Sequence, residues 1–192
     1  MQGFFSNIQA ICNYMHVDAR PSAWYNAEKE NAGENAMSIE AARAYLRERG
    51  AESRVREFSV SSATVELAAQ ALGVEGARIA KSLGFRQGEG CILVLAAGDA
   101  RIDNRKFRER FGMKAAMLRA EEVEPLTGHP VGGVCPFGRR AGVPVYLDES
   151  LRRFNTVFPA CGSPASAVEL TPDELFTLSE AEAWVDVCRL PE

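Results

Sequence analysis

The longest apolar run of the chain, Cys91–Ala97 (CILVLAA), places the strongest limit on its fold. Seven apolar residues in a row fit a buried β-strand, whereas a membrane-spanning helix needs about 20. A second strand pattern, Ser82–Phe85, precedes this run, and the turn Gln87-Gly88-Glu89-Gly90 separates the two. The chain is therefore expected to fold around a sheet and to have no membrane partner.

Helix and strand patterns alternate along the rest of the chain. Ser38 is expected to cap the first helix, Asp103 a later one, and Thr171 with Pro172 the last. Short strands mixed with short helices predict an α+β fold with a mixed sheet flanked by helices. The expected helices are 38–49, 64–72, 74–80, 104–111, 121–126 and one from Thr171; the further strands are 54–60, 114–118, 143–147, 156–158, 167–170 and 183–187.

The first 36 residues differ from the rest of the chain. Residues 26–35 (NAEKENAGEN) are polar and carry little periodic apolar content. We expect residues 1–36 to form an extension or linker and residues 37–192 to form one folded domain.

Composition excludes several classes of protein. A net charge of −4 argues against a protein that coats nucleic acid through phosphate neutralisation. The five cysteines are odd in number and contain no CxxC pair, and there are two histidines, so no metal centre or other cofactor is expected. Reduced thiols and the absence of a secretory signal pattern indicate a cytoplasmic protein. Residues 101–119 carry a local charge of +5, which fits either a solvated helix or a phosphate-facing surface.

The loop Gly128–Gly138 (GHPVGGVCPFG) is the most unusual stretch. Four glycines and two prolines in eleven residues exclude a helix or a central strand. Successive N–H groups in such a loop can form a nest that stabilises an oxyanion, although ordinary surface turns have the same composition.

Three side chains are candidates for chemistry. Lys81 ends an apolar stretch at the expected junction of a helix and a strand, where it either reaches solvent or points into a pocket. His129 and Cys135 share the glycine-rich loop and suggest a Cys–His nucleophile. No catalytic signature surrounds the cysteine, so a buried, unreactive thiol next to Pro136 is the favoured explanation.

Three segments resemble the YbaK/EbsC family, the free-standing relatives of the bacterial prolyl-tRNA synthetase editing domain. They are TVELAA (64–69) with LGV (72–74), IAKSL (79–83) and GGVCPFG (132–138). The resemblance covers the chain from about residue 38 to the C-terminus. It implies the curved mixed sheet of that family.

The resemblance also implies an aminoacyl-tRNA deacylase that acts in trans on the 3' CCA end of tRNA. Lys81 lies at the position of the functional lysine and would orient the substrate. The loop from Gly132 through Gly133 to Pro136 lies at the position of the family's G-x-x-x-P motif and would hold the oxyanion or the terminal ribose. An aminoacyl ester is already activated, so a positioned water would suffice without a side-chain nucleophile or a metal.

Other residues are assigned with less support from the motifs. Ser82, His129, Val134 and Cys135 are expected to shape the amino-acid pocket, and Arg101, Arg105 and Lys106 to contact tRNA phosphates. Cys135 replaces the Ser or Thr common before the loop proline, and Ser82 replaces Thr or Asn, so the amino acid removed is not assigned. A synthetase is a further expected partner, and the oligomeric state is left open. Two rival readings remain: a binding module of the same fold without turnover, and a hydrolase that uses Cys135 with His129.

Overall fold

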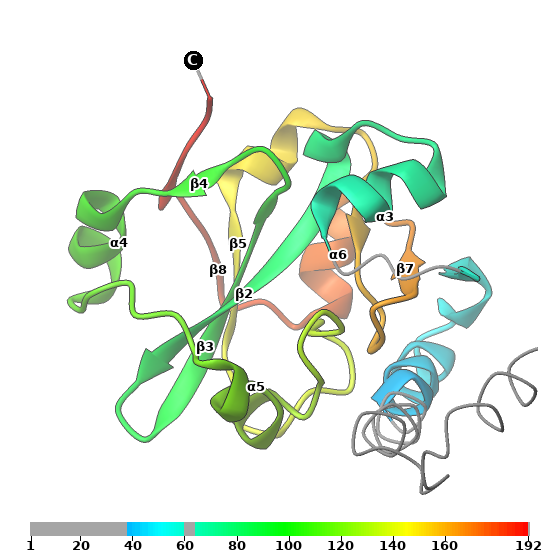
Figure 1. Ribbon diagram of the computed structural model, residues 1–192, viewed down its shortest axis with the longest axis horizontal. Coiled ribbons are helices and arrows are strands. Elements are labelled where there is room, and N and C mark those ends of the chain that lie inside the picture. The colour runs from blue at the N-terminus through cyan, green and yellow to red at the C-terminus, as the bar shows by residue number, and fades with distance from the viewer. Residues whose placement is uncertain (1–37, 60–63, 192) are drawn as a thin grey trace, which may run out of the picture. The chain divides into compact units, whose positions relative to one another are not determined.

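A five-stranded mixed sheet forms the centre of the protein in the computed structural model, which describes residues 38–59 and 64–191 (Figure 1). The strand order is β6-β2-β3-β5-β8, and only β2 and β3 run antiparallel to each other. The sheet is curved. The predicted α+β class with a curved mixed sheet flanked by helices is confirmed. The bounds are β2 Ile79–Gln87, β3 Gly90–Ala97, β5 Val145–Asp148, β6 Phe158–Pro159 and β8 Ala183–Val185.

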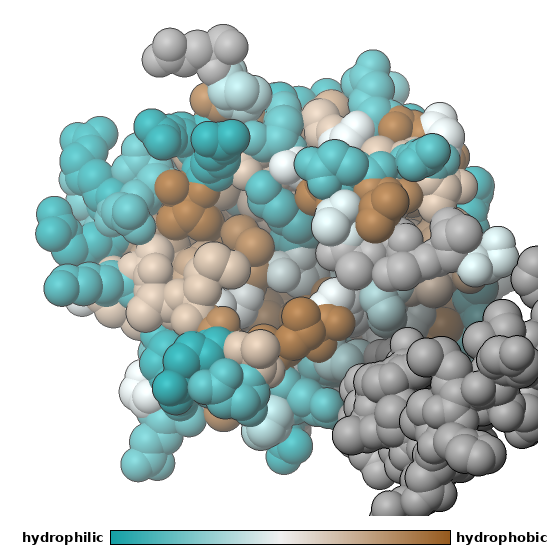
Figure 2. Space-filling model, viewed as in Figure 1, coloured by the Kyte–Doolittle hydropathy of each residue, from teal (hydrophilic) through white to brown (hydrophobic). Residues whose placement is uncertain are grey.

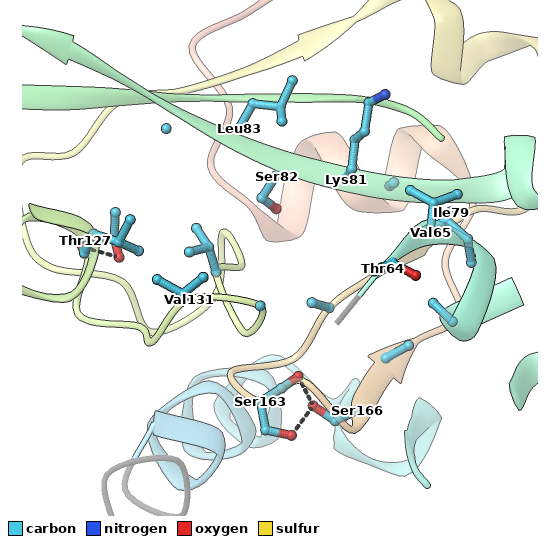
Figure 3. Close-up of a pocket in the computed structure, with 18 of the residues that line it drawn as sticks. Thr64, Val65, Ile79, Lys81, Ser82, Leu83, Thr127, Val131, Ser163 and Ser166 are labelled. Carbon is cyan, nitrogen blue, oxygen red and sulfur yellow. Dashed lines mark hydrogen bonds between the residues drawn. The ribbon is translucent and has the colours of Figure 1, made fainter. Parts of the chain in front are cut away.

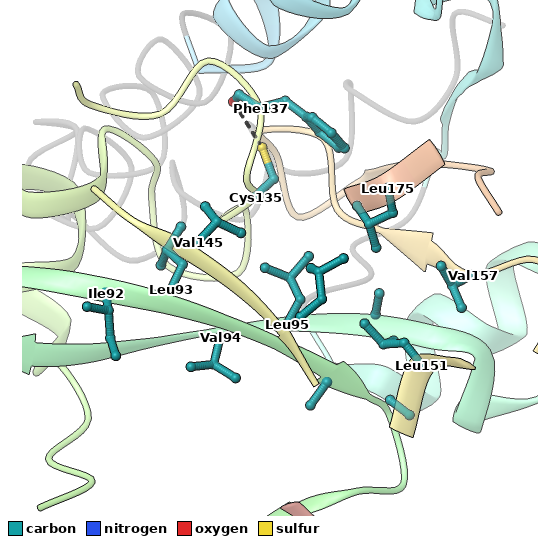
Figure 4. Packing of buried hydrophobic residues seen from close by; sticks show 14 of the residues in the cluster. Ile92, Leu93, Val94, Leu95, Cys135, Phe137, Val145, Leu151, Val157 and Leu175 are labelled. Atoms are coloured by element: carbon teal, nitrogen blue, oxygen red, sulfur yellow. Dashed lines mark hydrogen bonds between the residues drawn. The ribbon is translucent and has the colours of Figure 1, made fainter. Parts of the chain in front are cut away.

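Strand β3 is the centre of the hydrophobic core. Each residue from Cys91 to Ala97 is 5% exposed or less, because β2 and β5 cover both edges of the strand and side chains pack on both of its faces. Figure 4 shows Leu93 and Leu95 among Val145, Leu151 and other buried side chains. The predicted strand and the preceding turn are confirmed.

The helices with clear capping signals are confirmed. Thr64 Oγ1 accepts a hydrogen bond from Leu67 N at the start of α3, and Asp103 Oδ1 accepts from Arg105 N and Lys106 N at the start of α4. These bonds satisfy backbone donors that the first helical turn leaves free. In Figure 1, α4 lies at one end of the sheet and α3 and α6 lie at the other. The bounds are α3 Val65–Leu72, α4 Asn104–Phe111, α5 Ala120–Thr127 and α6 Pro172–Leu178.

Two predicted elements are wrong. The helix expected at 74–80 is only a 3-10 turn, Gly76–Arg78, after which Ile79 begins β2. The strand expected at 114–118 is an extended segment joined to β2 by one bridge, between Met117 and Phe85. In both places, pairing with β2 decides the backbone conformation in place of the local pattern.

Shorter elements surround the sheet. The described part of one helix covers residues 38–48 and includes Ser38, which is therefore a helical residue and not the expected cap. Two small antiparallel sheets pair β1 (Val55–Glu57) with β7 (Ser166–Val168) and β4 (Arg101–Ile102) with β9 (Cys188–Arg189).

The expected extension 1–36 and the end of the strand expected at 54–60 lie outside the described residues. None of the helices in the described part of the chain is long and apolar enough to cross a membrane.

Candidate functional site

A cavity of about 440 Å³ lies along the outer edge of β2 (Figure 3). Its walls come from the start of α3, the first six residues of β2, segment 117–127, loop 131–134 and segment 158–167. Most of the lining is apolar, which suits a site that must exclude water from a small organic ligand. The apolar lining residues include Val65, Ile79, Leu118, Val123, Val131 and Val134.

The mouth of the cavity carries exposed apolar side chains. Met117 is 59% exposed and Val131 is 61% exposed, and both line the cavity. Figure 2 shows hydrophobic side chains gathered on this face, among hydrophilic ones. This arrangement would give a ligand larger than the cavity an apolar surface to rest on.

The edge of β2 is left open beside the cavity. At one end of the strand, Ile79 and Ala80 pair with β6. Further along, Gly84 O accepts a hydrogen bond from Leu118 N and Arg86 N donates one to Ala116 O, both at 2.9 Å. The stretch between these two pairings faces the cavity.

Lys81 and Ser82 leave β2 on opposite sides (Figure 3). Both residues line the cavity. The Lys81 ammonium donates to Gly98 O at 3.0 Å and also to Ala100 O, in the turn that joins β3 to β4. Burial is the main cause that lowers the pKa of Lys81. The sequence predicted Lys81 at a helix–strand junction; it is instead the third residue of β2, and its half-buried charge is held by the turn between β3 and β4.

The glycine-rich loop contributes one turn to the cavity wall. Gly133 N donates to Pro130 O at 3.0 Å, and Gly132 has a φ of +85°, which is typical of the third position of a type II turn. Gly132 and Val134 line the cavity, whereas Gly133 and Pro136 do not. Since the Gly133 N–H is used inside the turn, the N–H groups of Gly132 and Val134 are the candidates for an oxyanion contact.

His129 and Cys135 are not part of the cavity wall; both are fully buried behind the loop. His129 Nε2 lies 2.9 Å from Phe137 O, which can only accept, so Nε2 carries the ring proton. His129 Nδ1 therefore accepts from the Ser38 hydroxyl at 2.6 Å. Both residues therefore lie behind loop 131–134, and neither faces a ligand in the cavity.

The same geometry argues against a Cys–His nucleophile. Cys135 Sγ is 3.5 Å from His129 Nε2, but that nitrogen is already protonated and cannot take the thiol proton. The thiol instead donates to Phe137 O at 3.3 Å (Figure 4). Burial raises the pKa of Cys135 far above its usual value, so the reactive thiolate is not formed.

Buried His129 predicts a pH-dependent stability. Burial lowers its pKa from 6.5 to about 4. The unfolded state binds the proton first as the pH falls, so stability is full above about pH 6.5 and is lost progressively down to pH 4, by about 3 kcal/mol in total. Urea unfolding of the wild type and of His129→Gln across this range should show a steeper fall for the wild type. Parallel curves would contradict the neutral, buried state of His129.

The basic segment is only partly free. Arg101 and Arg105 are exposed, and Arg105 forms a loose ion pair with Glu109 at 3.9 Å on the same helix. Lys106 Nζ pairs with Asp186 Oδ1 at 2.7 Å and donates to Cys188 O. Arg101 is near enough to Lys81 to contribute to its lowered pKa. Two of the three expected phosphate contacts are therefore available at the surface.

Reasoning from the sequence missed the wall of the cavity opposite β2. Ser163 and Ser166 line that wall. Met117, which lines the mouth beside β2, was missed as well. The sequence offers only a glycine–proline turn around Ser163 as a signal, and such a turn does not by itself indicate a cavity wall. In the described ranges, no cluster of three or more His, Cys, Asp or Glu side chains could hold a metal ion.

Known proteins are similar to this chain over most of its length. A family model described as the aminoacyl-tRNA editing domain matches residues 60–178. The chain is 55% identical over 154 residues to the uncharacterised protein YwhH of Bacillus subtilis (strain 168), covering 80% of this chain and 98% of that protein. It is similar to the crystal structure of a candidate trans-editing enzyme for prolyl-tRNA synthetase, with a TM-score of 0.72, 36% identity and coverage of 79% and 97% of the two chains. The hypothetical protein APE2540 gives a TM-score of 0.70 at 29% identity, covering 78% and 99%.

Proposed function

The chain belongs to the family of aminoacyl-tRNA editing domains, and from this membership we propose that it is a deacylase acting in trans. It hydrolyses the ester that joins a mischarged amino acid to the 3'-terminal adenosine of tRNA. The observation that carries this proposal is one cavity that holds Lys81, Ser82, Gly132 and Val134 together. The similar crystal structure of a candidate trans-editing enzyme for prolyl-tRNA synthetase supports the same reaction.

The chemistry of the ester suits the groups around the cavity. Water attacks the ester carbonyl, and the charge that develops on the carbonyl oxygen needs hydrogen-bond donors. Gly132 N–H and Val134 N–H would supply them from the loop. Cys135 plays no part as a nucleophile because its thiol stays protonated. The reaction therefore depends on positioning of the water and the ester.

The terminal adenosine would lie at the mouth of the cavity. Met117 and Val131 offer it an apolar surface there. Lys81 and Arg101 would place positive charge beside it, and Arg101 and Arg105 would contact the phosphates that precede it. Association with an aminoacyl-tRNA synthetase would bring this acceptor end to the site.

A binding module without turnover is the second candidate function, because none of the described residues that line the cavity carries a carboxylate or an imidazole that could act as a general base. A group of the substrate could assist the water instead. Turnover separates these two functions.

A panel of mischarged tRNAs tests the proposal. We expect at least one aminoacyl-tRNA to release free amino acid at a rate proportional to protein concentration, and correctly charged tRNA to remain intact. Cys135→Ser is expected to retain turnover because the thiol is buried and protonated.

The rival functions predict other results. Binding of tRNA without release of any amino acid would favour the binding module. Loss of turnover in Cys135→Ser with the fold intact, together with inactivation by a thiol reagent, would favour the cysteine hydrolase.

A further inference from the structure

One hydroxyl in the cavity differs from the others. Ser82 Oγ is buried and has no hydrogen-bond partner among the described residues. The other hydroxyl groups that line the cavity all have partners within the protein: those of Thr64, Thr127, Ser163 and Ser166. An unpaired buried hydroxyl costs about 1–3 kcal/mol, so its presence needs an explanation. A ligand in the cavity would supply the missing partner.

The main chain of Ser82 is open at the same place. Successive residues of a strand direct their N–H and C=O groups to alternate edges. Gly84 O and Arg86 N point away from β3, to Leu118 and Ala116, so Ser82 N–H and C=O point to that edge as well. The pairing with β6 reaches only Ala80. Among the described residues, the backbone N–H and C=O of Ser82 are therefore unpaired at this edge, as is its hydroxyl.

An open donor and acceptor on one residue match the polar groups of a single amino acid. Its α-amino nitrogen can donate to Ser82 C=O and Oγ, and its carbonyl oxygen can accept from Ser82 N–H. This is the pairing of β-strand addition, shortened to one residue. The apolar walls contributed by Leu118 and Val134 would enclose the side chain of that amino acid.

We propose that Ser82 anchors the α-amino and carbonyl groups of the bound aminoacyl group as a one-residue addition to β2. The proposal rests on the proposed deacylase function. It makes Ser82 a positioning residue that distinguishes amino acids from acyl groups without an α-amino nitrogen. A site built around such hydrogen bonds discriminates strongly against a ligand that lacks the matching group.

Stable amide analogues separate binding from hydrolysis. 3'-Amino-3'-deoxyadenosine carrying an alanyl group has the α-amino nitrogen, and the propionyl analogue lacks only that nitrogen. Alanine is a suitable probe because its methyl side chain fits any pocket that holds a larger one. By calorimetry, we expect the wild type to bind the alanyl analogue about tenfold more tightly than the propionyl analogue.

The variants test the hydroxyl and the fold together. Ser82→Ala should weaken binding of the alanyl analogue about tenfold and reduce the preference to within about threefold, whereas Ser82→Thr keeps a hydroxyl and should bind nearly as the wild type does. Ser82→Ala should also unfold at the same or a higher temperature, because it removes an unpaired buried polar group. A merely structural role for Ser82 predicts a lower unfolding temperature instead.

Several outcomes would overturn the proposal. They are equal affinity of the wild type for both analogues, binding of neither, or an unchanged preference in Ser82→Ala. If the alanyl preference depends on Ser82 but no mischarged tRNA is deacylated, the anchor stands and the deacylase function fails. If deacylation occurs and the wild type shows no preference, the function stands and the anchor fails.

Discussion

Lys81→Met is expected to lower kcat/KM for the deacylated aminoacyl-tRNA by about a hundredfold. Methionine keeps the length of the side chain and removes its charge. A hydrogen bond to a charged group contributes about 1.5–3 kcal/mol, and each 1.4 kcal/mol is a factor of ten. The loss should appear in the single-turnover rate constant at saturating protein if Lys81 acts on the reacting ester, and in the protein concentration at half-maximal rate if it acts only on binding.

The structural role of Lys81 must be separated from its effect on the substrate. Its ammonium donates to Gly98 O and Ala100 O, so Lys81→Met also leaves carbonyl groups without a donor. Lys81→Arg keeps the charge, but a planar guanidinium does not reproduce the ammonium geometry, so it should destabilise the fold similarly and retain more activity. Equal turnover per folded molecule in wild type and Lys81→Met would refute a role in catalysis.

The parts of the fold that follow local rules were predictable from the sequence. Helices α3, α4 and α6 are capped by Thr64, Asp103 and Thr171, whose side chains accept hydrogen bonds from backbone N–H groups in the first turn of the helix that follows. Such signals lie within a few residues of the structure that they specify. Strand β3 was equally predictable. Its apolar run has the length of a buried strand, and the glycine-containing turn before it favours a strand over a helix.

Residues 74–80 were mispredicted because their partners are distant in sequence. Ile79 and Ala80 pair with Phe158 and Pro159, and no local pattern indicates this pairing. The same pairing turns Lys81 and Ser82 to opposite sides of the strand.

The candidate site was predictable only in part. Lys81, Ser82, Gly132 and Val134 line one cavity, whereas Gly133 and Pro136 do not. His129 belongs instead to a buried network with Ser38, which is 91 residues away in sequence. Because a histidine in a loop can face either side, its direction follows from that distant partner and not from the spacing between His129 and Cys135.

Gly133→Ala is expected to disrupt the cavity although Gly133 does not line it. A Cβ atom at Gly133 would lie 2.9 Å from both Gly162 O and Ser163 Cα, which are backbone atoms. The loop 131–134 and the segment that carries Ser163 would have to separate, and they form two walls of the cavity. We expect a loss of about 1–3 kcal/mol in the free energy of unfolding and at least a tenfold loss in turnover.

Gly90→Ala is the matched control for this substitution. It adds the same methyl group at the start of β3, where the nearest atom, Gln87 O, is 3.8 Å away. Its stability should remain within about 0.5 kcal/mol of the wild type, with unchanged turnover. If Gly133→Ala is as stable and as active as Gly90→Ala, the contact between loop 131–134 and Ser163 does not shape the site. If it is less stable but hydrolyses its substrate at the wild-type rate when folded at low temperature, the loop supports the fold without positioning the ester.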